Sequence, residues 1–165
     1  MSMQPRTWIR GVLVAIALSA VRSAAAQTAS QTVNFQVDAI NQISVSAPSV
    51  TLNVTTATAG SAPTAVTSSS TTWAVTCNQT GAKITASIGS AMPSGVTLTA
   101  SLGAPAGAAS AGAQTLGTVA VDLVTGITKL NQSGLSVTYS LSATAAAGVV
   151  TATSRTVTYT ITGGT

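Results

Sequence analysis

Few side chains in this sequence are of the types that carry out chemistry. The chain has no histidine, and its two acidic residues are both aspartates. Beyond residue 26 the charged side chains are Asp38, Lys83, Asp122, Lys129 and Arg155. General acid–base catalysis and metal binding rely mainly on histidine, carboxylates and cysteine. The composition therefore predicts a protein that is not an enzyme, with no catalytic residues, no cofactor and no metal site.

Two combinations of residues could still form a catalytic site, but the surrounding sequence supports neither of them. Asp38 and Asp122 are the only carboxylates available for a glycosidase pair, but isolated aspartates usually lie in solvent or in turns. A Ser–Lys dyad would need Lys83 or Lys129, yet the chain contains no S-x-x-K and no G-x-S-x-G. The single cysteine, Cys77, is expected to pack as a small apolar side chain, with an intermolecular disulfide or a reactive thiol as the alternative.

Residues 1–26 have the pattern of a secretory signal peptide. Two arginines precede an apolar run, residues 11–21, which is shorter than the roughly 20 residues of a membrane-spanning helix. Small residues then lead to a cleavage site between Ala26 and Gln27. We expect export to the periplasm, the cell surface or the extracellular space, with no membrane span in the mature chain. An uncleaved anchor is the alternative.

Cleavage also changes the charge of the protein. Three of the six basic residues belong to the signal peptide, so three basic and two acidic side chains remain, with a net charge of +1. Binding of nucleic acid needs clustered lysine and arginine, and residues 27–165 contain no such cluster. We therefore expect no nucleic-acid partner.

Apolar and polar residues alternate throughout residues 27–165, which we expect to form one domain. Strict alternation with many Val, Ile and Thr predicts half-buried antiparallel strands. The apolar members of the runs are Val33, Phe35, Val37; Ile43, Val45; Val50, Leu52, Val54; Ile84, Ala86, Ile88; Val96, Leu98, Ala100, Leu102; Val119, Val121, Leu123; Leu135, Val137, Tyr139, Leu141; and Val157, Tyr159, Ile161. The predicted fold class is all-β, an antiparallel β-sandwich of eight or nine strands, immunoglobulin-like or Greek-key.

Several segments between the runs have their own predictions. Residues 78–81 and 131–134 are turn signals. The small-residue run 103–114 is expected to form a loop or an excursion at a sheet edge. Residues 137–141 and 157–161 are near copies. We expect them to be similar strands of a terminal hairpin, with an internal duplication as the alternative.

The first predicted strand, residues 31–38, is a candidate donor strand. Val33, Phe35 and Val37 are its alternate apolar side chains, and it follows the cleavage site almost directly. It would either pair within its own sheet or add to the edge of a neighbouring subunit. Addition to a neighbour is a heterologous contact, which builds a fibre. Self-association through strand edges is therefore one predicted partnership.

The predicted function is that of an exported, non-enzymatic structural or surface-associated protein. The alternative is a soluble secreted module that binds a glycan or a protein, with Trp73, Tyr139 or Tyr159 stacking on a sugar. Each of these aromatic residues shares the phase of Val, Leu or Ile in its strand, which favours burial in the core.

Five stretches resemble small exported bacterial β-sandwich proteins of uncharacterised function. They are residues 31–37, 39–46, 71–76, 91–98 and 155–162. More remotely, the layout is similar to camelysin-type matrix proteins and spore-coat-U type pilins, which implies a fibre or coat protein. Those pilins usually carry a disulfide pair, whereas this chain has only Cys77. The nearest match to a cell-wall-binding Trp-x-Leu motif is Trp73-Ala74-Val75, so that function is not implied.

Overall fold

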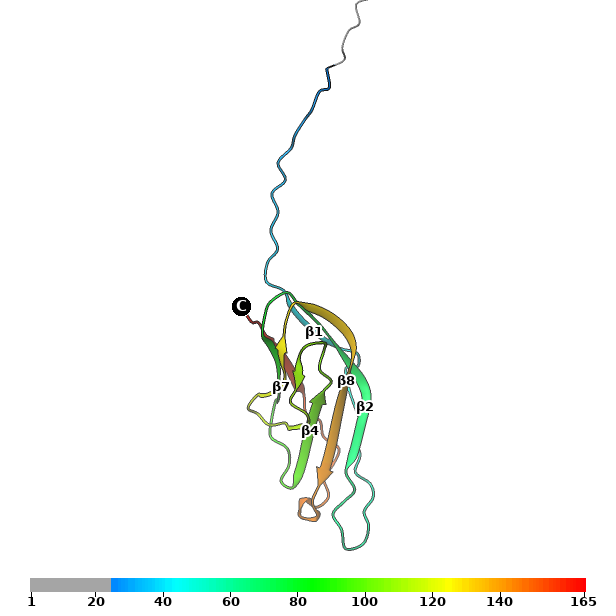
Figure 1. The fold of residues 1–165 in the computed structure, drawn as a ribbon. Helices are drawn as coiled ribbons and strands as arrows, with labels where there is room; N and C mark the ends of the chain where they lie inside the picture. Colours follow the sequence, from blue (N-terminus) through cyan, green and yellow to red (C-terminus); the bar gives the residue numbers. More distant parts are fainter. Residues whose placement is uncertain (1–24) are drawn as a thin grey trace, which may run out of the picture. The chain divides into compact units, whose positions relative to one another are not determined.

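Antiparallel strands make up nearly all the regular structure of the computed structural model, which describes residues 25–165 (Figure 1). Nine strands are present in this part, as predicted, and the one helical turn is a 3₁₀ turn, η1 (Ala145–Ala147). The strands are β1 (Asn41–Val45), β2 (Val66–Cys77), β3 (Ala82–Ile88), β4 (Val96–Leu102), β5 (Ala109–Ser110), β6 (Gln114–Thr115), β7 (Val121–Ile127), β8 (Leu130–Ala143) and β9 (Val157–Thr162). The predicted signal peptide, residues 1–26, lies almost entirely outside the described residues.

The strands form two antiparallel sheets. One has five strands in the order β1-β2-β8-β4-β6, and the other has four in the order β5-β7-β3-β9. Residues 37–165 contain both sheets and constitute one structural unit. The all-β, antiparallel class predicted from the alternation is confirmed.

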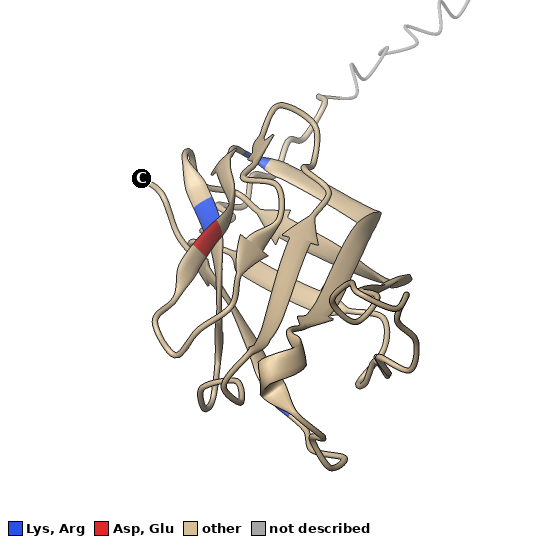
Figure 2. Cartoon of the chain, turned by 90° about the horizontal axis from the view of Figure 1, so that it is seen from below, with Lys and Arg blue, Asp and Glu red and all other residues tan. Residues whose placement is uncertain are grey.

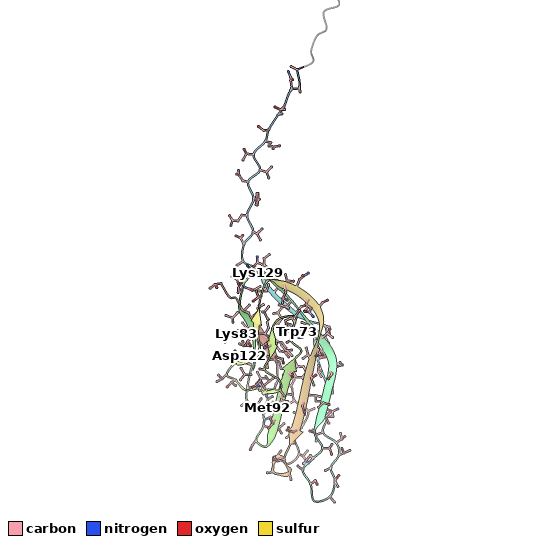
Figure 3. All side chains as sticks on the ribbon, in the orientation of Figure 1. Trp73, Lys83, Met92, Asp122 and Lys129 are labelled. Atoms are coloured by element: carbon pink, nitrogen blue, oxygen red, sulfur yellow. The ribbon has the colours of Figure 1, made fainter. Side chains whose placement is uncertain are left out.

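Buried side chains from both sheets pack into one apolar cluster. Trp73 and Val137 come from the five-stranded sheet, whereas Ile84 and Leu123 come from the four-stranded sheet. Figure 3 shows Trp73 among the side chains between the strands. The predicted phase is correct for the central strands, because the apolar residues of β3 and the later part of β4 face this cluster while their threonines do not.

The excursion predicted for residues 103–114 is confirmed. The chain leaves β4, pairs as β5 with β7 in the other sheet, and returns as β6 beside β4. Gly107 and Gly112 adopt positive φ angles of 77° and 72° on this path. Such angles suit glycine far better than other residues, which explains how this small-residue run can cross between sheets.

Two turn and hairpin predictions were wrong. The signal at residues 131–134 lies inside β8, where Gly134 has a φ of 70° and the pairing with β2 shifts register. A positive-φ glycine in a strand forms a β-bulge as readily as a turn. The near copies 137–141 and 157–161 do not form a hairpin, because β8 and β9 belong to different sheets.

Three predicted strands also differ from the structure. Residues 31–38 and 50–54 are not strands, and β7 begins at Val121 instead of Val119. Alternation indicates which side chains face an apolar environment. A strand also needs a neighbouring strand that forms hydrogen bonds with its backbone. Val50, Leu52 and Val54 are half-buried while Thr51 and Asn53 are exposed, so the predicted phase is present without a hydrogen-bonded ladder.

Candidate functional site: an unpaired sheet edge

Four strands occupy the ends of the two sheets: β1, β6, β5 and β9. Two of them, β5 and β6, are only two residues long, and very short edges offer little for another strand to bind. The outer edge of β9 is longer, and its sequence VTYTIT has no charge and no proline. β9 therefore lacks the features that usually discourage addition of another strand.

The hydrogen-bond register shows which backbone groups of β9 face outward. Gly89 N donates to Thr156 O at 3.2 Å, in the same register that pairs Ser87 with Thr158. Bonded and non-bonded pairs alternate along an antiparallel ladder, so Thr158 and Thr160 bond to β3. The N–H and C=O groups of the intervening residues, Val157, Tyr159 and Ile161, point toward the open side.

The inner face of β9 is incompletely covered. The four apolar side chains of its neighbour β3 are at most 2% exposed, whereas Val157, Tyr159 and Ile161 are only half-buried. Tyr139 and Leu141 in β8 are half-buried as well, although all five pack against the core. An apolar row with open backbone groups beside it is what an added strand would cover.

Two tyrosines connect the sheets at this edge. The hydroxyl oxygens of Tyr139 in β8 and Tyr159 in β9 lie 2.6 Å apart and share a hydrogen bond. Burial raises the pKa of both phenols above the ordinary value of 10.0. For Tyr159 the hydrogen bond with Tyr139 raises the pKa further, whereas for Tyr139 the same bond lowers it.

These pKa shifts predict a loss of stability in alkali. The unfolded chain begins to lose its tyrosine protons near pH 10, but the folded chain keeps them to a higher pH. The stabilisation is therefore fully present below about pH 10 and is lost as the pH rises toward the folded pKa values. Urea unfolding at about pH 8 and pH 11 should show this decrease, and the double variant Tyr139→Phe/Tyr159→Phe should show a smaller one. An equal decrease in the double variant would contradict the assignment.

Residues 47–55 run next to the core without a ladder. Leu52 packs against the core cluster, yet none of the described hydrogen bonds involves the backbone between Ser46 and Thr56. Ser46 N donates to Thr72 O before this stretch, and Thr64 N donates to Thr56 O after it. The stretch is thus a second extended segment whose backbone is unpaired in the chain.

The predicted donor residues lie on an exposed segment outside both sheets. Val33 is 72% exposed, Phe35 is 91% exposed and Val37 is 77% exposed. These are unusual values for large apolar side chains, and the three alternate along the chain. Phe35 is the one exposed aromatic residue in the part of the chain that the structure describes, because Trp73 is buried and both tyrosines are half-buried.

The side chain of Asn78 forms two hydrogen bonds with the backbone at the end of this segment. Its Nδ2 donates to Asp38 O at 2.8 Å, and its Oδ1 accepts from Ile40 N at 2.7 Å. The backbone N of Asn78 also donates to Ile40 O at 3.1 Å. The sequence presents Asn78 only as part of the turn signal at residues 78–81. Its contact with Ile40 spans 38 residues, and no local sequence pattern predicts such a contact.

The residues considered for chemistry are not brought together. Asp122 in β7 forms an ion pair with Lys83 in β3, with Nζ and Oδ1 3.0 Å apart, whereas Asp38 precedes β1 in the segment that Asn78 holds. Figure 2 shows how sparse the charged residues are on this fold. Within residues 25–165, His, Cys, Asp and Glu form no group of three that would hold a metal ion. Cys77 is buried and unbridged, with Sγ 3.4 Å from Gln79 N.

The described residues form two small surface depressions. They measure about 140 and 130 Å³ and lie over β1 and β2, the second one also beside Ser133 and Gly134 of β8. Small-molecule sites usually measure about 300–1,000 Å³. Trp73 is 1% exposed and its Nε1 donates to Gly103 O at 3.2 Å, so its ring is not available to stack on a sugar. No helix in residues 25–165 is long and apolar enough to cross a membrane.

Comparison with known proteins adds no family to this description. No protein-family model matches the chain, and no significant match was found among curated proteins or solved structures.

Proposed function

We propose that this chain is an exported, non-enzymatic structural subunit that assembles by strand donation. The two sheets form an incomplete, immunoglobulin-like β-sandwich, open beside β9. Residues 31–38 of one copy add as a strand along the β9 edge of the next copy. One observation carries this proposal: the same chain has three exposed apolar side chains at alternate positions and an unpaired edge with a half-covered apolar face.

Addition of the donor strand would cover its own apolar side chains and the half-buried apolar row beside β9 at the same time. Residues two apart on a strand face the same side, so Val33, Phe35 and Val37 would all lie over the half-buried row of the acceptor. Fully burying each side chain of this kind contributes about 1.5–3 kcal/mol. The backbone of the donor would pair with the outward N–H and C=O groups of β9, as in other cases of β-augmentation.

The signal peptide predicted from the sequence supports a location outside the cytoplasm. Export follows from the signal peptide predicted for residues 1–26 and places the protein in the periplasm, at the cell surface or outside the cell.

One donor and one acceptor per copy make a heterologous contact, which propagates into an open filament instead of closing as a dimer. The low charge means that such an assembly would depend little on ionic strength.

The alternative function, a soluble module that binds a glycan or a protein, lacks an aromatic platform. The three aromatic residues within residues 37–165 are buried or half-buried. Phe35 is exposed, but it lies on the candidate donor segment, where strand donation already accounts for it.

Deleting residues 27–36 tests the proposal. The chain from Gln27 should form multimers or filaments, seen by light scattering after size exclusion and by electron microscopy. The chain from Val37 retains the whole structural unit and should remain a folded monomer, because it has an acceptor edge but no donor. A lasting monomer from Gln27 that binds polysaccharide would instead favour the alternative function.

A further inference from the structure

The hydrogen-bond register of β9 limits how another strand can add to it. Its open N–H and C=O groups belong to Val157, Tyr159 and Ile161, and the side chains of the same three residues pack against the core. In an antiparallel ladder, two residues that exchange both hydrogen bonds lie directly opposite each other with their side chains on the same face. An added antiparallel strand therefore places its inward-facing residues directly opposite these three.

The donor segment has the same pattern as this edge. Residues 33–37 read V-N-F-Q-V and residues 157–161 read V-T-Y-T-I, each with an aromatic residue between two β-branched ones. A slip of one residue would turn the apolar donor side chains to solvent. A slip of two residues would leave one of them beyond the end of the row on β9. Only the centred register, with Phe35 opposite Tyr159, pairs all three.

The Thr162 end of β9 is occupied by the rest of its own domain. Gly163 packs so closely there that a Cβ on it would lie 2.6 Å from Asn41 Nδ2. Thr165 then exchanges two backbone hydrogen bonds with Thr80, at 3.0 and 3.1 Å. A second domain could not lie directly beyond this end without displacing these contacts.

The Val157 end of β9 follows an exposed loop instead. Every residue from 148 to 154 is exposed, and Val149 is 98% exposed. In the donor copy, β1 begins soon after Val37, so the donor domain must lie beside whichever end of β9 its Val37 reaches. Antiparallel addition brings Val37 to the Val157 end, whereas parallel addition would bring it to the occupied end.

We infer that the donor segment of one copy adds antiparallel to β9 of the next copy, with Phe35 directly opposite Tyr159. This inference rests on the proposed function and specifies the direction and register of the donated strand. Three donor and three acceptor residues then form three hydrogen-bonded pairs. Each domain lies beyond the Val157 end of the one that accepts its strand, so the copies follow one another end to end.

The same register favours donation between copies. Asn41 lies beside Gly163 of its own chain, and an extended chain from Val157 to Gly163 covers about 20 Å at about 3.3 Å per residue. The chain from Val37 to Asn41 spans at most about 14 Å. The donor segment of a chain therefore falls short of its own β9 in this register while β1 stays in place.

Disulfide bonds between engineered cysteines test the register. In the inferred arrangement, Asn34 lies opposite Thr160 on the outer face, as a pair without mutual hydrogen bonds, and such pairs are the closest in an antiparallel ladder. Their spacing suits a disulfide, and Thr160 is exposed in the single chain. The chain from Gln27 with Asn34→Cys and Thr160→Cys, the antiparallel pair, should form a ladder of covalent multimers on a non-reducing gel after equilibration in a glutathione redox buffer.

The matched control carries Asn34→Cys and Thr158→Cys and is called the parallel pair. Thr158 is exposed on the same face of β9 and would lie opposite Asn34 only if the donor ran parallel. In the inferred register the two residues are diagonal neighbours about 7–8 Å apart, which is too far for an unstrained disulfide. The control should assemble by light scattering but form few covalent multimers. Cys77 is buried and is present in both variants.

Three results would overturn the inferred register while leaving strand donation in place. The first is more covalent multimer from the parallel pair than from the antiparallel pair. The second is assembly of both variants without cross-linking of the antiparallel pair. The third is equal cross-linking of the two pairs.

A separate variant tests the function on which the register rests. Adding the triple-serine substitutions (Val33→Ser, Phe35→Ser and Val37→Ser) to the antiparallel pair should abolish both the assembly and the covalent ladder. Multimers that persist in this background would overturn strand donation itself, as would an internally bridged monomer of the antiparallel pair.

Discussion

The triple-serine variant, with Val33→Ser, Phe35→Ser and Val37→Ser, is expected to remain monomeric at concentrations where the wild-type mature chain forms multimers. Its free energy of unfolding should stay within about 0.5 kcal/mol of the wild-type value, as for other surface substitutions. The reason is that Val33, Phe35 and Val37 are exposed in the single chain and become buried only when a neighbour accepts the segment. Light scattering after size exclusion measures the first effect, and urea unfolding measures the second.

The matched control changes the other face of the same segment. Thr32→Ser and Asn34→Ser together alter residues of the opposite phase, which would face solvent in the added strand. This double variant should assemble as the wild-type chain does. If both variants lost assembly equally, or neither did, the alternate apolar side chains would not be the anchors, and the donor assignment would be wrong.

Trp73→Ala is expected to lower the free energy of unfolding by about 3–5 kcal/mol, the usual cost of removing a large buried aromatic side chain. Trp73 lies in β2 opposite Val45 of β1 and Leu135 of β8, and it is 1% exposed. Its loss leaves a cavity in the shared core and removes the hydrogen bond to Gly103 O. Because domains are stable by only about 5–15 kcal/mol, this variant should be close to unfolding.

Trp73→Phe separates the two contributions. It keeps much of the apolar volume but removes the indole N–H, so we expect a smaller loss, with about 1 kcal/mol from the missing hydrogen bond. Urea unfolding followed by far-UV circular dichroism measures both variants without relying on the lost fluorophore. A cost below about 1 kcal/mol for Trp73→Ala would contradict the placement of this side chain at the centre of the core.

The sequence predicted the paired strands well, but it did not predict which alternating segments would lack a hydrogen-bonded partner. For β3 and β8, apolar residues alternate and meet the core on one face, so period and burial agree with the sequence. For residues 50–54 the same period is present, but no neighbouring strand pairs with the backbone. Hydrogen-bond partners come from distant residues, and the period of a segment contains no information about them.

The candidate site shows the same division. The spacing of Val33, Phe35 and Val37 predicts a candidate donor strand. The sequence presents Tyr139 and Tyr159 as members of two similar runs and as candidates for stacking on a sugar. That β8 and β9 belong to different sheets, with Tyr139 and Tyr159 in contact between them, depends on the strand order. The contact of Asn78 with residues 38 and 40 likewise depends on how β1 pairs with β2.

The amino-acid sequence by itself determined the all-β class, the phase of most strands and the shortage of reactive side chains, because these are properties of residue type and local period. It also predicted an apolar segment of strand period at residues 31–38. Only the tertiary structure decided that β9 ends a sheet with its outer backbone groups unpaired. Only the tertiary structure placed the side chain of Asn78 against Asp38 and Ile40, just before β1. Edges and junctions arise from pairings between residues far apart in the chain, and a local pattern cannot specify which pairing will be left open.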